Sequence, residues 1–301
     1  MKEIGGYFEL AGGNQPRYHN GIYLNSGRNA LRFIVRKLGI SKLHVPAYTC
    51  PVVFEALQKE QVQIEQYTLD ANFFPDRDFP QSDFIIYNNY FGVCGGKVRE
   101  MATRYPNLIV DNAQAFYSQQ IGRVAFYSPR KFFGLPDGGI VCGLEGDAED
   151  LLQDVSWNRM SHLLKRVDLG ASAGYADFKE NSQILARQDV KRMSALTTLL
   201  MSQIDCSAAA KRRRRNFNML KDHLPTEFPL DMVDDDVPMV YPYITSDPQL
   251  RKRLIDAKIY VASYWPGVGN CGDFPERVIP LPIDQRYDIE DMQRILEVAK
   301  S

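Results

Sequence analysis

Apolar and polar positions in the first half of the chain follow a strand–helix–strand order. Unbroken apolar runs of four or five residues recur, and between them apolar residues take helical spacing, as over residues 28–38. Continuous apolar runs are typical of strands in a largely parallel sheet whose two faces are both covered by helices. Strands are predicted within residues 22–25, 43–50, 62–69, 83–92, 107–116, 124–129 and 138–143, with helices over 51–61 and 97–106.

The pattern changes in the second half of the chain. From about residue 147 to 223 it is mostly helical, and from Val237 a smaller pattern of strands and helices follows. Here strands are predicted within 237–244, 259–265 and 278–283, and helices over 247–258 and 289–300. The sequence thus predicts an α/β fold with a large domain over residues 1–205 and a small α+β domain over residues 206–301.

Composition excludes several classes of protein. The chain has 301 residues, of which 45% are hydrophobic and 24% charged, and its net charge of -1 creates no field that would attract nucleic acid or acidic membranes. Five cysteines without a CxxC pair suit reduced thiols better than disulfides or a metal site. Neither a signal peptide nor a membrane-spanning run is evident, so we expect a cytoplasmic protein without a membrane or nucleic-acid partner.

Polar residues that directly follow apolar strands are the first candidates for a site, because ligands of α/β sheets gather at the carboxyl ends of strands. The segment Ser26–Leu31 opens a helix, where free amides favour a phosphate and Gly27 permits close approach. Asp111 follows one strand, and Ser128 and Lys131 follow the next. Each feature alone has an ordinary interpretation, as a helix cap, a turn residue or a surface lysine.

Together, these features match the needs of one cofactor, pyridoxal phosphate. A lysine amine forms a Schiff base with its aldehyde, a carboxylate keeps its ring nitrogen protonated, and amides with a hydroxyl hold its phosphate. For Lys131 to act as a base, we expect burial to lower the pKa of its amine below the usual value of roughly 10.4.

Five segments of the sequence resemble the DegT/StrS family of sugar aminotransferases, within the fold-type I pyridoxal phosphate enzymes. In order along residues 20–300 they read SGRNAL, VPAYTC, VDNAQAF, SPRKFFGLPDGG and LPIDQRY. The resemblance implies an aminotransferase, active as a homodimer with its site at the interface. It also implies glutamate as the amino donor and a keto sugar, free or nucleotide-linked, as the acceptor, in polysaccharide or related biosynthesis.

The resemblance assigns roles to individual residues. Lys131 becomes the catalytic Schiff-base lysine, Asp111 the partner of the ring nitrogen, and Gln114 a neighbour of the ring. Ser128, with the Ser26–Arg28 segment (Ser26, Gly27 and Arg28), would bind the phosphate. The family position that covers the ring corresponds to Cys50, with Tyr48 as the other candidate. Tyr90 and Trp265 are candidate substrate contacts.

Two alternatives stay open at this stage. The asparagine motif with which a partner chain completes the phosphate site in that family is not found, so a cofactor-binding member with a regulatory or scaffolding role is one alternative. A sugar dehydratase is the other, although such relatives usually carry histidine in place of the lysine.

Other charged features have ordinary interpretations. The basic run Lys211–Phe217 is expected to be a solvated helix face or an interface, and Asp234–Asp236 a solvated turn. The four histidines show no metal-ligand spacing.

Overall fold

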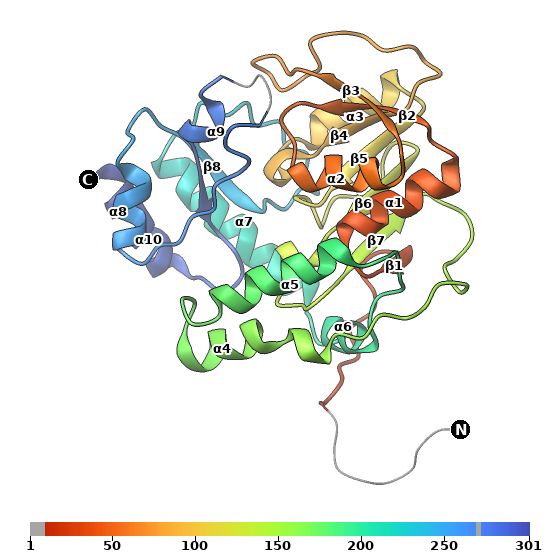
Figure 1. Cartoon of the computed structure of the whole chain (residues 1–301). Coiled ribbons are helices and arrows are strands. Elements are labelled where there is room, and N and C mark those ends of the chain that lie inside the picture. The colour runs from red at the N-terminus through yellow and green to blue at the C-terminus, as the bar shows by residue number, and fades with distance from the viewer. Residues whose placement is uncertain (1–9, 269–271) are drawn as a thin grey trace.

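The computed structural model describes residues 10–268 and 272–301. Its centre is a seven-stranded sheet with the order β1-β7-β6-β5-β4-β2-β3, in which β7 alone runs antiparallel to its neighbours (Figure 1). The strands are β1 (Ile22–Leu24), β2 (Lys42–Pro46), β3 (Gln63–Tyr67), β4 (Ile85–Asn88), β5 (Leu108–Asn112), β6 (Val124–Tyr127) and β7 (Gly139–Cys142).

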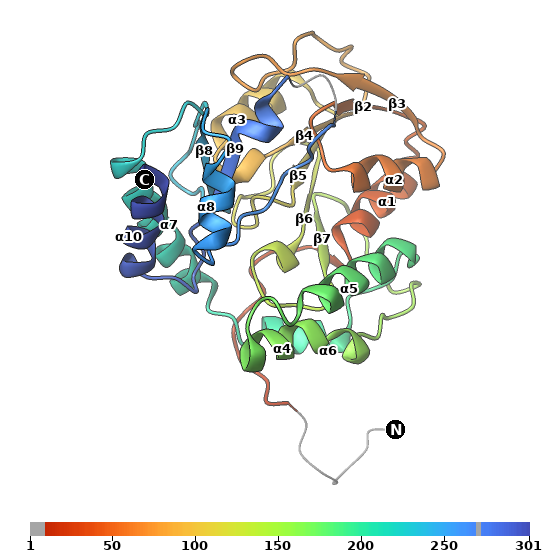
Figure 2. The ribbon, with the colours of Figure 1, turned by 60° about the vertical axis from the view of Figure 1, so that its left-hand side comes forward.

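Helices cover both faces of this sheet (Figure 2). The first, α1 (Gly27–Leu38), packs with α2 (Pro51–Lys59) over one face, where its apolar residues join those of β2 and β6. Behind the other face lies α3 (Gly95–Arg104), and the short 3-10 turns η1 (Tyr90–Gly92) and η2 (Pro129–Lys131) follow β4 and β6. The expected α/β fold is therefore confirmed.

A helical segment and a second sheet complete the chain. The segment comprises η3 (Trp157–Arg159), α4 (Ser161–Leu169), α5 (Tyr175–Arg187) and α6 (Ala195–Met201). It leads to α7 (Cys206–His223) and to the antiparallel pair β8 (Val240–Ile244) and β9 (Val278–Pro282), with α8 (Leu250–Asp256), α9 (Phe274–Arg277) and α10 (Ile289–Lys300). One continuous apolar core runs from the α3 face of the large sheet into this second sheet.

One predicted strand is wrong. Residues 259–265 form no strand, because among the described residues the second sheet contains β8 and β9 alone, and left-handed φ angles of 60° at Lys258 and 54° at Trp265 bound the run at both ends. The side chains of Tyr264 and Trp265 pack instead against the apolar core.

Candidate functional site

The carboxyl ends of β4, β5 and β6 bring three polar residues to one edge of the sheet. In the strand register Asn88 lies beside Asp111, which lies beside Phe126. Side chains two residues apart in a strand share a face, so Asn88 and Asp111 project on the α1–α2 face, together with Phe126. Ser128 follows two residues after Phe126. This edge is the place where the sequence predicts a ligand.

Asp111 is a buried carboxylate with only 8% of its surface exposed. Its Oδ1 accepts a hydrogen bond of 2.8 Å from the Ala113 amide, a turn contact that occupies one of the two carboxylate oxygens. Burial raises the pKa of Asp111, whereas the positive charge of Lys131 lowers it.

Lys131 ends η2 and lines a cavity of about 1220 Å³. Its side chain is exposed in the single chain, so the expectation of a buried amine is not met. The next two residues, Phe132 and Phe133, are buried, and their amides donate to the Pro129 carbonyl at 3.0 Å. The backbone of the lysine is thus anchored while its amine is free to reach a ligand.

The start of α1 provides a place for a phosphate. Ser26 caps the helix, since its Oγ accepts from the Asn29 amide at 3.2 Å, so the ordinary interpretation holds for this hydroxyl. The first amides of a helix have no intrahelical partner and favour anions. A Cβ on Gly27 would lie 3.4 Å from the Ser128 Cβ and 3.7 Å from its Oγ, so the Ser128 hydroxyl stands beside these amides.

Two arginines add positive charge near this helix start. The Arg28 Nε is buried and, within the described residues, has no hydrogen-bond partner. Burial lowers the pKa of Arg28, and burial together with the nearby Arg28 charge lowers that of Arg130 to about 10. An anion bound near the two guanidinium groups would oppose the lowering of both pKa values. Arg130 was not singled out from the sequence, although it directly precedes Lys131.

Gln114 and Asn88 each carry a buried polar atom that lacks a partner among the described residues. Gln114 Oε1 accepts from the Phe91 amide at 2.8 Å, which leaves its Nε2 unpaired. Asn88 Nδ2 donates to Thr49 Oγ1 at 2.8 Å, which leaves its Oδ1 unpaired. Unpaired buried polar atoms are rare in native proteins and commonly meet a ligand or water. The sequence signal for Asn88, missed above, was its place after a strand, like that of Asp111.

The residues that were expected to contact the cofactor ring or the substrate differ in how accessible their side chains are. Tyr48 is 2% exposed and its ring stacks on Tyr90 at 5.7 Å, while the Tyr90 hydroxyl donates to the Tyr48 carbonyl at 2.7 Å. Both tyrosines therefore belong to the aromatic core. Trp265 is partly buried against Tyr48, with 4.9 Å between ring centroids. Cys50 is partly exposed at the N-cap of α2, which makes it the more accessible of the two ring-cover candidates.

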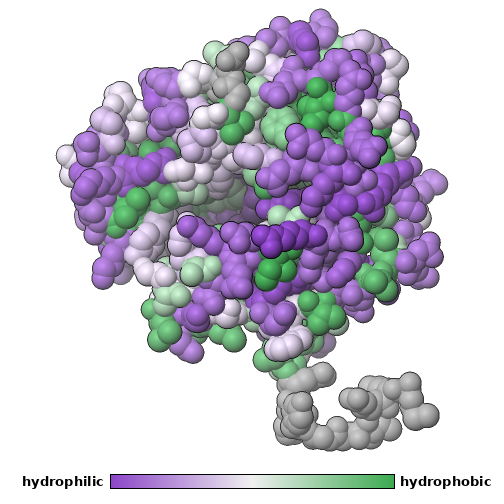
Figure 3. Space-filling view, viewed as in Figure 1, coloured by the Kyte–Doolittle hydropathy of each residue, from purple (hydrophilic) through white to green (hydrophobic). Residues whose placement is uncertain are grey.

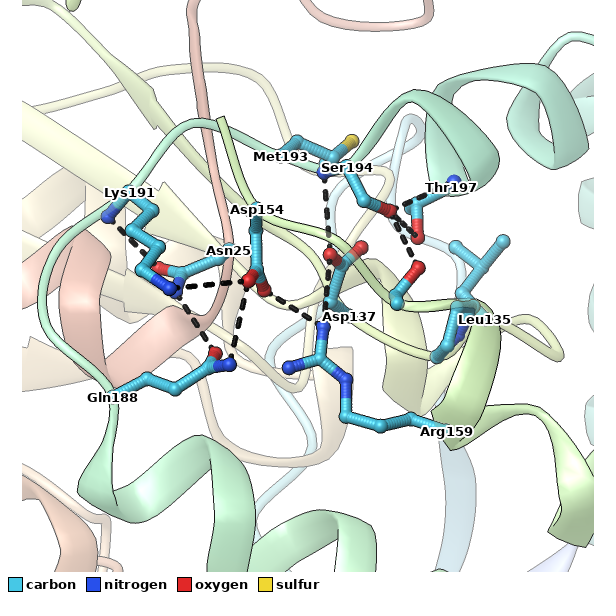
Figure 4. Close-up of polar contacts among 12 residues, drawn as sticks. Asn25, Leu135, Asp137, Asp154, Arg159, Gln188, Lys191, Met193, Ser194 and Thr197 are labelled. Atoms are coloured by element: carbon cyan, nitrogen blue, oxygen red, sulfur yellow. Dashed lines mark hydrogen bonds and ion pairs between the residues drawn. The ribbon is translucent and has the colours of Figure 1, made fainter. Parts of the chain in front are cut away.

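A buried ion-pair network anchors the turn after Lys131 (Figure 4). Arg159 Nη2 lies 2.7 Å from Asp154 Oδ2 and 3.5 Å from Asp137 Oδ2, and all three side chains are almost fully buried. The Ser194 amide donates to Asp137 Oδ2 at 3.2 Å. The network joins the helical segment to the Lys131 turn, and it was not foreseen from the sequence.

The remaining charged features are resolved in part by the structure. Within residues 10–268 and 272–301 there is no group of three or more His, Cys, Asp or Glu side chains placed to hold a metal ion, and no helix is long and apolar enough to cross a membrane. Cys271 lies outside the described residues. In the basic run Arg213 is fully buried, so this run is not entirely a solvated face.

Comparisons with known proteins were made at the levels of sequence and structure. No family model and no curated protein matches the sequence. A DegT DnrJ EryC1 StrS aminotransferase from Brucella abortus matches the structure with a TM-score of 0.58 and 16% identity, over 94% of this chain and 85% of that chain. Spr1654 of Streptococcus pneumoniae, in its PLP form, matches with a TM-score of 0.61 and 13% identity, over 93% and 86%.

A third structural match is DesV of S. venezuelae in complex with a ketimine intermediate. Its TM-score is 0.59 at 18% identity, over 93% of this chain and 84% of that chain. At sequence identities this low, the structural matches establish a shared fold and nothing further. The protein described here has the fold of the sugar aminotransferases of the DegT/StrS type.

Proposed function

We propose that this protein is a pyridoxal phosphate-dependent aminotransferase that transfers an amino group from glutamate to a keto sugar, free or nucleotide-linked. The observation that carries the proposal is that Asp111 and Lys131 come from the ends of the paired strands β5 and β6, which places both at one edge of the sheet. The α1 start, with Gly27 beside Ser128, supplies a phosphate site at the same edge. The structural neighbours include sugar aminotransferases, one of them in a PLP form, and this supports the proposal.

The residues at this edge fit the cofactor. Bound pyridoxal phosphate supplies an aldehyde that links to amines and a ring that stabilises negative charge on the substrate carbon. The helix start at Arg28, the Ser128 hydroxyl and the Arg28 guanidinium suit its phosphate. A protonated ring nitrogen would give the desolvated Asp111 carboxylate the cationic partner that a buried charge requires.

In the proposed reaction, residues of the chain bind and orient the cofactor and move protons. Lys131 Nζ, on an anchored turn, would take the proton from the substrate carbon and later return one. The Asp111 carboxylate would stabilise the positive charge of the ring nitrogen, and the unpaired Gln114 Nε2 would offer a hydrogen-bond donor. Cys50, at the α2 N-cap, would help to cover the ring.

We also propose that a second copy of the chain completes the site. The helical segment exposes large apolar side chains next to the Lys131 cavity, which Figure 3 shows as a hollow between α5 and the C-terminal elements, and such apolar patches mark interfaces. Val167, Tyr175 and Phe178, at 84%, 57% and 47% exposure, line the cavity, and Leu164 and Leu169, at 59% and 69%, lie on the same helix α4 as Val167. A copy seated there would cover Lys131 and lower its exposure.

The test is spectroscopic. Purified protein with added pyridoxal phosphate should develop the absorbance band of a lysine-bound cofactor, and Lys131→Ala should abolish the band. Glutamate should then convert the bound cofactor to its amine form, and keto sugars or sugar nucleotides should reverse the conversion. A protein that stays colourless overturns the proposal, whereas cofactor binding without conversion by glutamate indicates a non-catalytic member of this fold.

A further inference from the structure

Arg213 is the most deeply buried of the arginines in the run Lys211–Phe217. It lies on α7 with 1% of its surface exposed, and burial lowers its pKa to about 10. No ion pair with a carboxylate is formed by Arg213 among the described residues, since the nearby Asp284 is bound by Arg286 at 2.7 Å. A buried cation without an anionic partner is costly and calls for a specific role.

Its guanidinium instead binds neutral acceptors from three separate segments. Arg213 Nε donates to Gln285 Oε1 at 2.8 Å, Nη1 to the Met239 carbonyl at 3.0 Å, and Nη2 to the Phe132 carbonyl at 3.4 Å. Gln285 Nε2 donates to the same Phe132 carbonyl at 2.7 Å. The planar fork of arginine serves several acceptors at once, which lysine does not.

Phe132 directly follows Lys131, so these contacts act on the backbone that carries the proposed catalytic amine. Arg213 also lies over the Phe132 ring, with 4.7 Å between its Cζ and the ring centroid. Both the ring and the carbonyl of Phe132 are thereby held from the side of α7. These contacts with Phe132 are independent of the Asp137–Arg159 network, which anchors the same turn further along the chain.

A second line of hydrogen bonds leads from Arg213 toward Gln114. Met239, whose carbonyl Arg213 binds, donates its amide to the Phe91 carbonyl at 2.8 Å, and the Phe91 amide donates to Gln114 Oε1 at 2.8 Å. Phe91 has a φ of 56°, a left-handed conformation that a bulky residue keeps only when its surroundings hold it. Hydrogen bonds thus link Arg213 directly to Phe132, next to Lys131, and through Met239 and Phe91 to Gln114.

We propose that Arg213, with Gln285, is a positioning residue that sets the Lys131 backbone relative to Gln114. The catalytic role of Lys131 in this inference rests on the proposed function. The effect of Arg213 on the backbone at Lys131 concerns the protein without cofactor. Arg213 and Gln285 border the Lys131 cavity, but the Arg213 guanidinium is already engaged by Gln285, Met239 and Phe132. It acts through Phe132 on one side and through Met239 and Phe91 on the other, and so couples α7 and the second sheet to the catalytic lysine.

The first experimental arm uses the apoprotein, so that it does not depend on the proposed function. Arg213→Lys keeps the charge but loses the fork, and Lys211→Gln, on the exposed face of the same helix, is the control. Hydrogen exchange should be at least ~10-fold faster at the Phe132 and Phe133 amides in Arg213→Lys because their turn opens more often, and unchanged in Lys211→Gln. Unchanged exchange in a folded Arg213→Lys overturns the proposal.

The second arm uses the cofactor-loaded protein. Arg213→Lys should capture pyridoxal phosphate about 10- to 100-fold more slowly, because a misplaced amine loses its favourable orientation. The pH at which the cofactor band changes should also shift, an effect that a merely structural residue would not produce. If Arg213→Lys does not fold, Gln285→Leu, which removes the 2.7 Å bond to Phe132, replaces it in the measurements of hydrogen exchange and of cofactor capture. A wild-type protein that binds no cofactor overturns the proposed function alone.

Discussion

Gly27 and Ser128 approach each other so closely that a Cβ on Gly27 would lie 3.4 Å from the Cβ of Ser128. The two residues come from different parts of the sheet edge, Gly27 after β1 and Ser128 after β6. The gap between them contains the first amides of α1 and the Ser128 hydroxyl. Substitution of Gly27 therefore tests this part of the proposed phosphate site.

Gly27→Ala should weaken the binding of pyridoxal phosphate by about tenfold, equivalent to ~1.4 kcal/mol, because the added methyl fills the gap. The apoprotein should be unharmed or stabilised by ~0.4–1 kcal/mol, since 3.4 Å is an ordinary contact and alanine reduces the freedom of the unfolded chain. Cofactor titration and urea denaturation measure the two effects.

Gly39→Ala is the matched control. Gly39 has a φ of 62° at the end of α1, so alanine there should cost ~1–2 kcal/mol of stability and leave cofactor affinity unchanged. Equal losses of affinity in both variants would contradict the proposed phosphate site.

Asp111→Asn should stabilise the apoprotein at neutral pH while weakening the loaded form. Burial raises the folded pKa of Asp111 above its unfolded value near 3.8, so the folded state holds this proton longer and loses stability as pH rises from about 4 through the folded pKa. Asparagine removes that loss. The melting temperature measured from pH 4 to 7 should fall less in Asp111→Asn than in wild type, and a steeper fall would contradict the assignment.

Arg159→Leu should destabilise the fold by ~3–5 kcal/mol, because it leaves Asp137 buried without a cation and Asp154 with Lys191 alone, at 3.6 Å. Urea denaturation measures the loss. Arg166→Leu, on the neighbouring helix α4, is the control and should change stability by less than ~0.5 kcal/mol. A small effect of Arg159→Leu would mean that water reaches the network.

Cys50 should react with a thiol reagent in the apoprotein and be protected by pyridoxal phosphate. Cys206 is also partly exposed but lies on α7, so it should react at the same rate with and without cofactor, whereas the buried Cys94 and Cys142 should stay slow. Peptide mass spectrometry identifies the modified residues. Equal labelling of Cys50 in both forms would show that it does not cover the ring.

Val167→Glu tests the proposed dimer. Val167 is 84% exposed on α4, so a charge there should not disturb the folded single chain but should weaken association by ~10-fold or more if this face is the interface. Sedimentation velocity measures the change. Glu227→Lys, remote from the helical segment and 76% exposed at its side chain, is the charge control.

Local sequence patterns determined most of the elements and the main chemical residues. The strands over residues 85–88 and 108–112 are short apolar runs that form because each buries both faces, and the helix at Pro51 begins where a proline is tolerated. Asp111 and Lys131 could be selected because each follows a strand, and parallel strands end at the same edge. The predicted strand at residues 259–265 failed because apolar composition does not reveal whether a neighbouring strand is available for pairing, and among the described residues the second sheet contains β8 and β9 alone.

Only the tertiary structure decided which polar and aromatic side chains are buried and what they meet. Arg213 stands among similar arginines in the sequence, and its burial depends on segments up to 81 residues distant that surround α7. Tyr48 and Cys50 are two residues apart, yet packing puts the first in the aromatic core and leaves the second partly exposed. Sequence alone fixes local periodicity and residue chemistry, whereas burial arises from contacts between segments far apart in the chain, which no local pattern encodes.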